Sequence, residues 1–103
     1  MLFDDTYRTI RNRATGQYKE KGSKFIAIAS PVRDENEVKK ELEAIRKEYY
    51  DARHHCFAYV IGFNREAYRI NDDGEPSGTA GRPIHGQILS NDLTNVLIVV
   101  VRY

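Results

Sequence analysis

One glycine-rich segment in the second half of the chain carries the residue types that often surround a bound anion. It runs from Asp72 to Ile84 with the sequence DDGEPSGTAGRPI. Its glycines permit backbone conformations that other residues resist, and it leads into a predicted helix whose first amides favour negative charge. Thr79, Gly81 and Arg82 are therefore candidate ligands for a carboxylate or phosphate. The alternative is that the glycines and Pro76 only shape a tight connection between a strand and a helix.

Acidic and imidazole side chains offer acid–base chemistry near the same segment. Asp73 and Glu75 suggest acid catalysis or a site for a hard cation, although Asp-Asp-Gly is also a common turn sequence. His54 and His55 open a predicted strand, and we expect one of them to reach the acidic loop. Pairing with a carboxylate there is as consistent with a structural hydrogen bond as with catalysis.

Cys56 follows the two histidines, an order that suggests a nucleophile and its base. Adjacent strand residues point to opposite faces, however, and His54 on the same face has its Cα roughly 7 Å away. We therefore interpret Cys56 as a small core residue. With one cysteine, three histidines and no His-Glu-x-x-His pair, the sequence predicts no metal site. We assign no catalytic residue and expect no cofactor.

The overall composition is that of one ordinary domain. The chain has 103 residues, and 16 basic against 15 acidic side chains give a net charge of +1. This balance argues against indiscriminate nucleic-acid binding through a global positive field. A single cysteine favours a reducing compartment. The first residues lack the basic segment and apolar core of a signal peptide, so we expect none, and no apolar run approaches the roughly 20 residues that span a bilayer. We expect a cytoplasmic protein without membrane contact.

Hydrophobic periodicity and turn residues predict an N-terminal arm over residues 1–15 and one domain over residues 16–103. Asp34 is the expected N-cap of a helix with an apolar stripe. The elements expected in the domain are a hairpin over 16–32 with its turn at 20–22, a helix over 34–50, a strand over 54–61, a return strand from 68, a helix from 79–82 to about 90, and an apolar strand over 96–102.

Four segments together resemble the N-terminal domain of the IMPACT/YigZ family. They are KGSKFIA from Lys21, ARHHC from Ala52, the whole stretch from Asp72 to Ile84, and VVVRY from Val99. The resemblance implies an α+β fold shared with a domain of a small-subunit ribosomal protein. With the predicted elements, this gives a two-layer sandwich: a four- to five-stranded, mostly antiparallel sheet with two helices on one face.

The resemblance also implies a role in translation regulation. We expect a binding domain that contacts a translation-associated protein or RNA through Thr79, Gly81 and Arg82, with Lys24, His54 and His55 nearby. The alternative is an enzyme that acts on a small anionic or phosphorylated substrate, using a histidine with Asp73 and Glu75. The two differ in whether a closed pocket holds a carboxylate or histidine with a sharply shifted pKa.

The family pattern continues beyond this sequence. In relatives, the Arg-Tyr pair is followed by a Gly-Gly loop and another helix, whereas here the chain ends at Tyr103. We therefore expect a domain that is incomplete at its C-terminal end. The strand from Val96 to Val101 has no polar residue and needs cover on both faces. We expect it to expose an apolar patch or to cover that patch by pairing with another chain, through which the protein self-associates.

Overall fold

The structure is a computed structural model that describes residues 9–103. Residues 1–8, which form most of the expected arm, lie outside the described part. The first strand begins at Ala14, two residues before the expected start of the domain. The elements are β1 (Ala14–Glu20), β2 (Ser23–Pro31), α1 (Glu35–Glu48), β3 (His54–Ile61), β4 (Ala67–Asn71), α2 (Gly81–Ser90) and β5 (Val96–Arg102).

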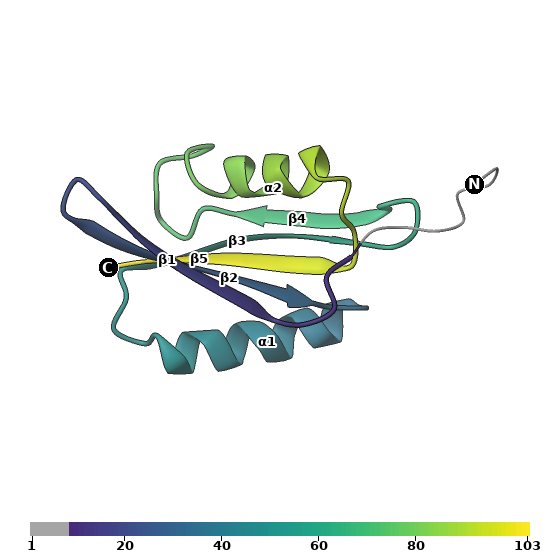
Figure 1. Ribbon diagram of the computed structural model, residues 1–103, viewed down its shortest axis with the longest axis horizontal. Helices are drawn as coiled ribbons and strands as arrows, with labels where there is room; N and C mark the ends of the chain where they lie inside the picture. Colours follow the sequence, from purple (N-terminus) through teal and green to yellow (C-terminus); the bar gives the residue numbers. More distant parts are fainter. Residues whose placement is uncertain (1–8) are drawn as a thin grey trace.

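The five strands of residues 9–103 form one sheet in the order β1-β2-β5-β3-β4, and every neighbouring pair is antiparallel. This confirms the α+β class and the antiparallel sheet. The apolar strand β5 lies in the centre, between β2 and β3 (Figure 1). Its central position explains its composition, because a strand with neighbours on both edges and helices on both faces of the sheet has few solvent-facing side chains to keep polar.

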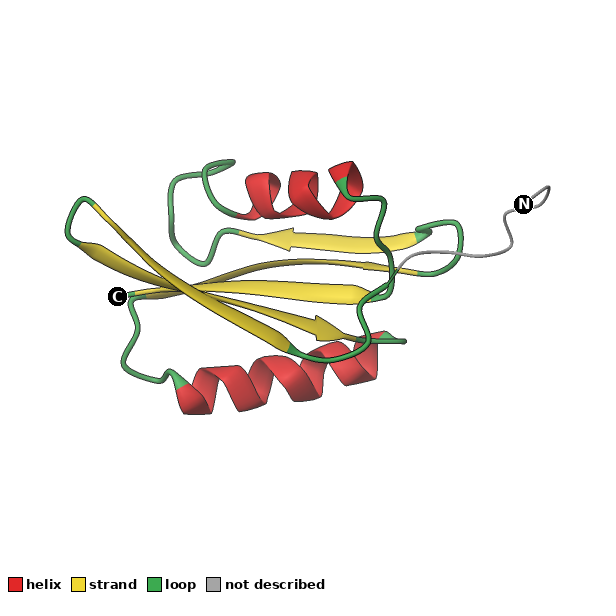
Figure 2. Ribbon diagram, viewed as in Figure 1, coloured by secondary structure: helices red, strands yellow, loops and turns green. Residues whose placement is uncertain are grey.

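The two helices lie on opposite faces of the sheet, so the domain has three layers (Figures 1 and 2). The expectation of two layers with both helices on one face is wrong. Strand β3 shows the physical reason, because both of its faces are apolar and each one needs a helix. Its larger side chains, Phe57 and Tyr59, pack under α1. Its smaller ones, Cys56 and Ala58, pack under α2.

The larger core lies between α1 and the sheet. Its buried members are Ile26, Ile28, Val32, Val38, Leu42, Ile45, Phe57, Tyr59, Ile61, Leu97, Val99 and Val101. Helix α1 begins as predicted: Asp34 is its N-cap, and the carboxylate of Asp34 accepts a hydrogen bond from the Glu37 N–H at 2.8 Å. The Glu37 carboxylate reaches back to the N–H of Arg33 at 2.7 Å. A cap of this kind fixes where the helix starts and therefore which stripe faces the sheet.

The second core lies between α2 and the β3–β4 half of the sheet. Its buried members are Cys56, Ala58, Val60, Ile84, Ile88 and Val96. Helix α2 contacts β3 and β4, so the β1–β2–β5 half of this face has less cover. Ile98 and Val100 on β5 are accordingly only partly buried. The apolar patch expected around β5 is thus reduced to these two side chains.

The central position of β5 also bears on self-association. Both backbone edges of the strand are used, by β2 on one side and by β3 on the other. Another copy therefore has no free edge of β5 to pair with, and self-association through the partly covered face of this strand stays a prediction. In the described part of the chain, the sheet edges without a neighbouring strand belong to β1 and β4.

Strands β1 and β2 form a long hairpin that projects from the body of the domain (Figure 1). Its two-residue turn consists of Lys21 and Gly22, which have φ angles of 49° and 81°. Positive φ at both positions is the type I′ geometry that matches the twist of the two strands. Every residue of β1 is exposed, so this strand is held mainly by its pairing with β2.

Candidate functional site

Four side chains from four different strands form a row across the α2 face of the sheet. The strand register places Tyr18 beside Phe25, Phe25 beside Arg102, and Arg102 beside His54. The Tyr18 and Phe25 rings are stacked, with centroids 4.9 Å apart. The guanidinium carbon of Arg102 lies 5.9 Å from the Phe25 centroid. The row thus changes from aromatic at the sheet edge to polar at the centre.

The polar end of the row is joined to the glycine-rich loop by an ion pair. Nη1 of Arg102 donates to both carboxylate oxygens of Glu75, at 2.8 and 2.9 Å, and only 13% of the Glu75 side chain is exposed. Nε2 of His54 lies 3.7 Å from the same carboxylate. Nδ1 of His54 lies 2.6 Å from the backbone oxygen of Asp73. A carbonyl oxygen only accepts, so Nδ1 is the donor there.

These residues border a hollow of about 190 Å³ between the β1–β2 hairpin and the start of α2, which we call the α2 hollow. Its walls are the aromatic pair on one side and α2 on the other, and Glu75 and Arg102 supply charged groups. The residues that line it are Tyr18, Phe25, Cys56, Glu75, Thr79, Ala80, Pro83, Ile84, Val100 and Arg102.

The amides at the start of α2 are already bound to a carboxylate of the chain itself. Oδ1 of Asp72 accepts from the N–H groups of Ala80 and Gly81 at 3.1 and 2.7 Å. Its Oδ2 accepts from Gly78 N–H at 3.0 Å. These bonds, the strongest being that from Gly81, lower the pKa of Asp72. An external anion at this helix start would have to displace Asp72, so the expected anion site is occupied from within.

The candidate ligands of this loop lie in different places. Gly81 is buried where α2 meets β4, and a Cβ there would come within 2.3 Å of Ile70 Cγ2 and within about 3 Å of the Asn71 backbone. This glycine is therefore required for close packing. Thr79 lines the α2 hollow, and its hydroxyl donates to the Pro76 carbonyl. Arg82 is exposed on α2.

His55, Asp73 and Lys24 belong to a different part of the molecule from the α2 hollow. Nε2 of His55 lies 2.8 Å from the backbone oxygen of Tyr49, behind the end of α1. The Asp73 carboxylate accepts from the His55 N–H at 2.7 Å and lies 3.8 Å from its Nδ1. The Lys24 ammonium lies over the Tyr103 ring. Of the eight predicted site residues, only His54, Glu75 and Thr79 converge on the hollow or its rim.

Cys56 is buried, as predicted, with 2% of the residue exposed. Its thiol donates to the Asp72 carbonyl at 3.1 Å. Burial, followed by the nearby carboxylates of Glu75 and Asp73, raises the pKa of the thiol to about 11. Only the thiolate is a strong nucleophile, so Cys56 serves as part of the floor of the hollow.

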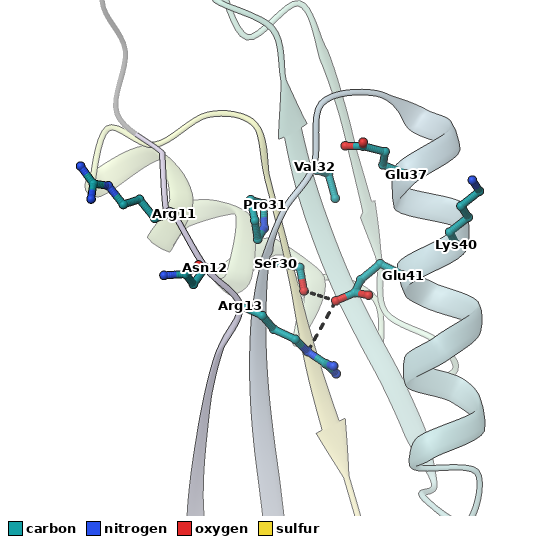
Figure 3. A pocket seen from close by; sticks show the side chains of 9 residues that line it. All are labelled: Arg11, Asn12, Arg13, Ser30, Pro31, Val32, Glu37, Lys40 and Glu41. Atoms are coloured by element: carbon teal, nitrogen blue, oxygen red, sulfur yellow. Dashed lines mark hydrogen bonds and ion pairs between the residues drawn. The ribbon is translucent and has the colours of Figure 1, made fainter.

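A larger groove of about 480 Å³ lies between the start of β1 and α1 (Figure 3). Two of its charged groups bind each other: Arg13 pairs with Glu41 at 3.5 Å. Arg13 also pairs with Glu48 of α1 at 3.1 Å, and the Ser30 hydroxyl donates to Glu41. Figure 3 shows Arg13 and Glu41 pointing together, whereas Arg11 points away. These ion pairs tie the start of β1 to α1, which favours a structural role for this groove.

The sequence reasoning did not select Arg102, Phe25 or Tyr18 as site residues. The signal that could have found Arg102 is strand alternation, because Arg102 is the one charged residue in β5 and shares a face with Val100 and Val96. Its pairing with His54 depends on register, which one strand alone does not reveal. The stacking of Tyr18 on Phe25 follows from the hairpin turn, which was predicted correctly.

Within residues 9–103, no group of three or more His, Cys, Asp or Glu side chains is arranged to hold a metal ion. No helix there has the length and apolarity needed to cross a bilayer.

Comparison with known proteins places the chain in a family. Residues 21–103 match the model of the Impact N-terminal domain. IMPACT family member YvyE of Bacillus subtilis is 38% identical over 98 residues, which are 95% of this chain and 45% of that protein. IMPACT family member YigZ of Escherichia coli is 39% identical over 85 residues, which are 81% of this chain and 42% of that protein.

A solved structure described as a crystal structure of a hypothetical protein has the same fold. It superposes with a TM-score of 0.90 at 34% identity, over 94% of this chain and 48% of that chain. The chain thus spans less than half the length of the curated relatives it matches. With a family model that covers most of its length and relatives above one-third identity, the chain belongs to the IMPACT family.

Proposed function

We propose that the chain is a non-catalytic binding domain of a translation-regulation protein, and that it contacts a translation-associated protein through the α2 hollow. The observation that carries the proposal is the composition of the hollow: an aromatic pair and apolar side chains around one neutralised ion pair. Pockets of this kind accept an apolar anchor from a partner protein. The link to translation comes from the family resemblance.

The electrostatics favour a protein over RNA as the partner. Binding to RNA requires cations that are free to meet phosphates. Arg102, however, is neutralised by Glu75, and the net charge of the chain is only +1. The Nε–H of Arg102 is buried without a hydrogen-bond partner among the described residues. After a small shift of the guanidinium, a main-chain carbonyl of a protein partner would satisfy this donor.

The geometry supports catalysis less well. One imidazole nitrogen of His54 and one of His55 face a backbone carbonyl oxygen, and Cys56 is a buried thiol. The loop amides that would hold a small anionic or phosphorylated substrate are bound to Asp72. The close approach of His54 to Glu75 is the one feature that favours an enzyme, and it keeps that alternative open to the test below.

The test is capture of translation components by the immobilised 103-residue protein, with and without RNase. Tyr18→Ser removes the outer wall of the hollow, and Tyr50→Ser is the matched control because both tyrosines are exposed, by 50% and 81%. We expect a translation-associated protein to be retained after RNase, with affinity reduced about fivefold or more by Tyr18→Ser only.

Loss of capture on RNase treatment would assign RNA instead. Equal binding by both variants would remove the hollow from the contact surface, and turnover of phosphorylated metabolites that needs His54 would favour the enzyme.

A further inference from the structure

The outer edge of β1 is a free strand edge with a defined hydrogen-bonding pattern. The two-residue turn makes Glu20 and Ser23 a hydrogen-bonded pair, so Tyr18, Gly16 and Ala14 also bond toward β2. The N–H and C=O groups of Thr15, Gln17 and Lys19 therefore point outward. Within residues 9–103, no backbone or side-chain group is hydrogen-bonded to them. This is a three-residue ladder without a partner strand.

Gly16 in the middle of this strand has no explanation within the domain. It does not have a positive φ, and a Cβ built on it would meet nothing within 4 Å. Glycine weakens a strand relative to other residues, and in a strand it often marks a place where another backbone approaches closely. An edge strand that is fully exposed and has no side chain at its centre can pair closely with another strand.

The sequence of β1 is complementary to itself in one antiparallel register. Placing Gln17 opposite Gln17 of a second copy is the register that overlaps all seven residues, Ala14 to Glu20. It pairs the outward groups of Thr15 with those of Lys19, and it puts Tyr18 opposite the bare Gly16. An aromatic side chain across from an edge glycine is a known stabilising arrangement. No like charges face each other directly, because Lys19 lies opposite Thr15 and Glu20 opposite Ala14.

We propose that β1 is a self-association surface, through which two copies of this chain join their sheets antiparallel about a two-fold axis at Gln17. The interface is isologous, as in most symmetric dimers. It is small, so the dimer is weak and forms in the micromolar to millimolar range. The surface adjoins the α2 hollow and shares Tyr18 with it. The Gln17 side chain lies on the opposite face of the sheet from Tyr18, so substitutions at Gln17 leave the hollow unchanged.

The position of Gln17 on the axis gives a direct test by sedimentation velocity at low salt, over a range of protein concentrations. Gln17→Lys and Gln17→Glu each put two like charges opposite one another, and each should weaken the dimer by about two- to fivefold. An equimolar mixture of the two variants should recover an association at least as strong as that of the wild type. Gln17→Thr keeps the backbone N–H and adds no charge, and it should associate like the wild type.

A second measurement needs no variant. Raising the protein concentration should slow hydrogen exchange of the outward amides of Thr15, Gln17 and Lys19, while those of Gly16 and Tyr18, already bonded to β2, change little. A wild-type protein that stays monomeric throughout would overturn the proposal. So would dimers insensitive to Gln17→Lys, a charged mixture no stronger than its components, or outward amides that do not respond to concentration.

Discussion

Asp72 occupies, within the chain, the place that an external anion would take at the start of α2. Its carboxylate accepts three backbone hydrogen bonds, from Gly78, Ala80 and Gly81. The loop around it therefore has a structural purpose that a search for ligand-binding glycines does not reveal. Glycines and amides at a helix start suit both an anion site and an internal cap. Which of the two they form depends on whether an acidic side chain of the chain itself accepts their hydrogen bonds.

We expect Asp72→Asn to lower the melting temperature of the protein by several degrees at pH 7, because an amide cannot accept all three bonds. The folded pKa of Asp72 lies below its ordinary value of 3.8. Its stabilising contribution is therefore fully present above that value and is lost as the pH falls through the folded pKa. The difference in melting temperature between wild type and variant should shrink in acid. Glu43→Gln, an exposed site on α1, is the control; an equal effect there would mean that net charge alone is responsible.

The thiol of Cys56 should react slowly with a water-soluble disulfide reagent in the native protein. Its burial and a pKa of about 11 leave little thiolate at neutral pH. Labelling should become rapid once denaturant unfolds the chain, which provides the internal reference. Rapid labelling under native conditions at pH 7 would instead show an accessible thiolate and would revive a nucleophilic role for this residue.

The elements themselves show which local signals are reliable. The cap at Asp34, the hairpin turn at Lys21 and the bounds of β3 and β5 agree with the sequence reasoning, because each depends on neighbours along the chain. The cap of α2 was not foreseen, since its acceptor comes from Asp72, eight or nine residues before the amides that it binds. Hydrophobic periodicity predicts the ends of an element least well where a side chain distant in sequence fixes those ends.

Two glycines in α2 provide a matched pair for testing how the helix is held. Gly81→Ala should destabilise the protein by about 1–3 kcal/mol, because its Cβ would collide with Ile70 and the Asn71 backbone. Gly86→Ala meets nothing within 4 Å and should stabilise it by about 0.4–1 kcal/mol, since alanine favours helix. Chemical denaturation of both variants measures this difference. If Gly86→Ala destabilised the protein as much as Gly81→Ala, the clash at Gly81 would not be what distinguishes the two glycines.

At the scale of the whole molecule, the placement of the two helices was the main feature that the sequence reasoning missed. The apolar stripe of α1 and the short apolar face of α2 reveal only that each helix covers something. The choice of face depends on the match between side-chain sizes, with Phe57 and Tyr59 under α1 and Cys56 and Ala58 under α2. The candidate site could not be predicted for the same reason. Its row of side chains comes from four strands that are neighbours only in the observed strand order: Tyr18, Phe25, Arg102 and His54.

A three-layer domain makes the two cores energetically separate. Ile45 and Ile88 are both fully buried, but they lie on opposite faces of the sheet. Ile45→Val and Ile88→Val should each reduce the free energy of unfolding by about 0.5–1.5 kcal/mol.

Because no side chain is shared between the two sites, the double variant should lose the sum of the two effects to within about 0.3–0.5 kcal/mol. Urea denaturation of the four proteins closes this cycle. A coupling energy well above that range would mean that the two cores are not independent, for instance because a shift of β3, which contributes to both, passes from one to the other. Additive losses are the result expected when the sheet separates the helices, because the two isoleucines then share no packing partner.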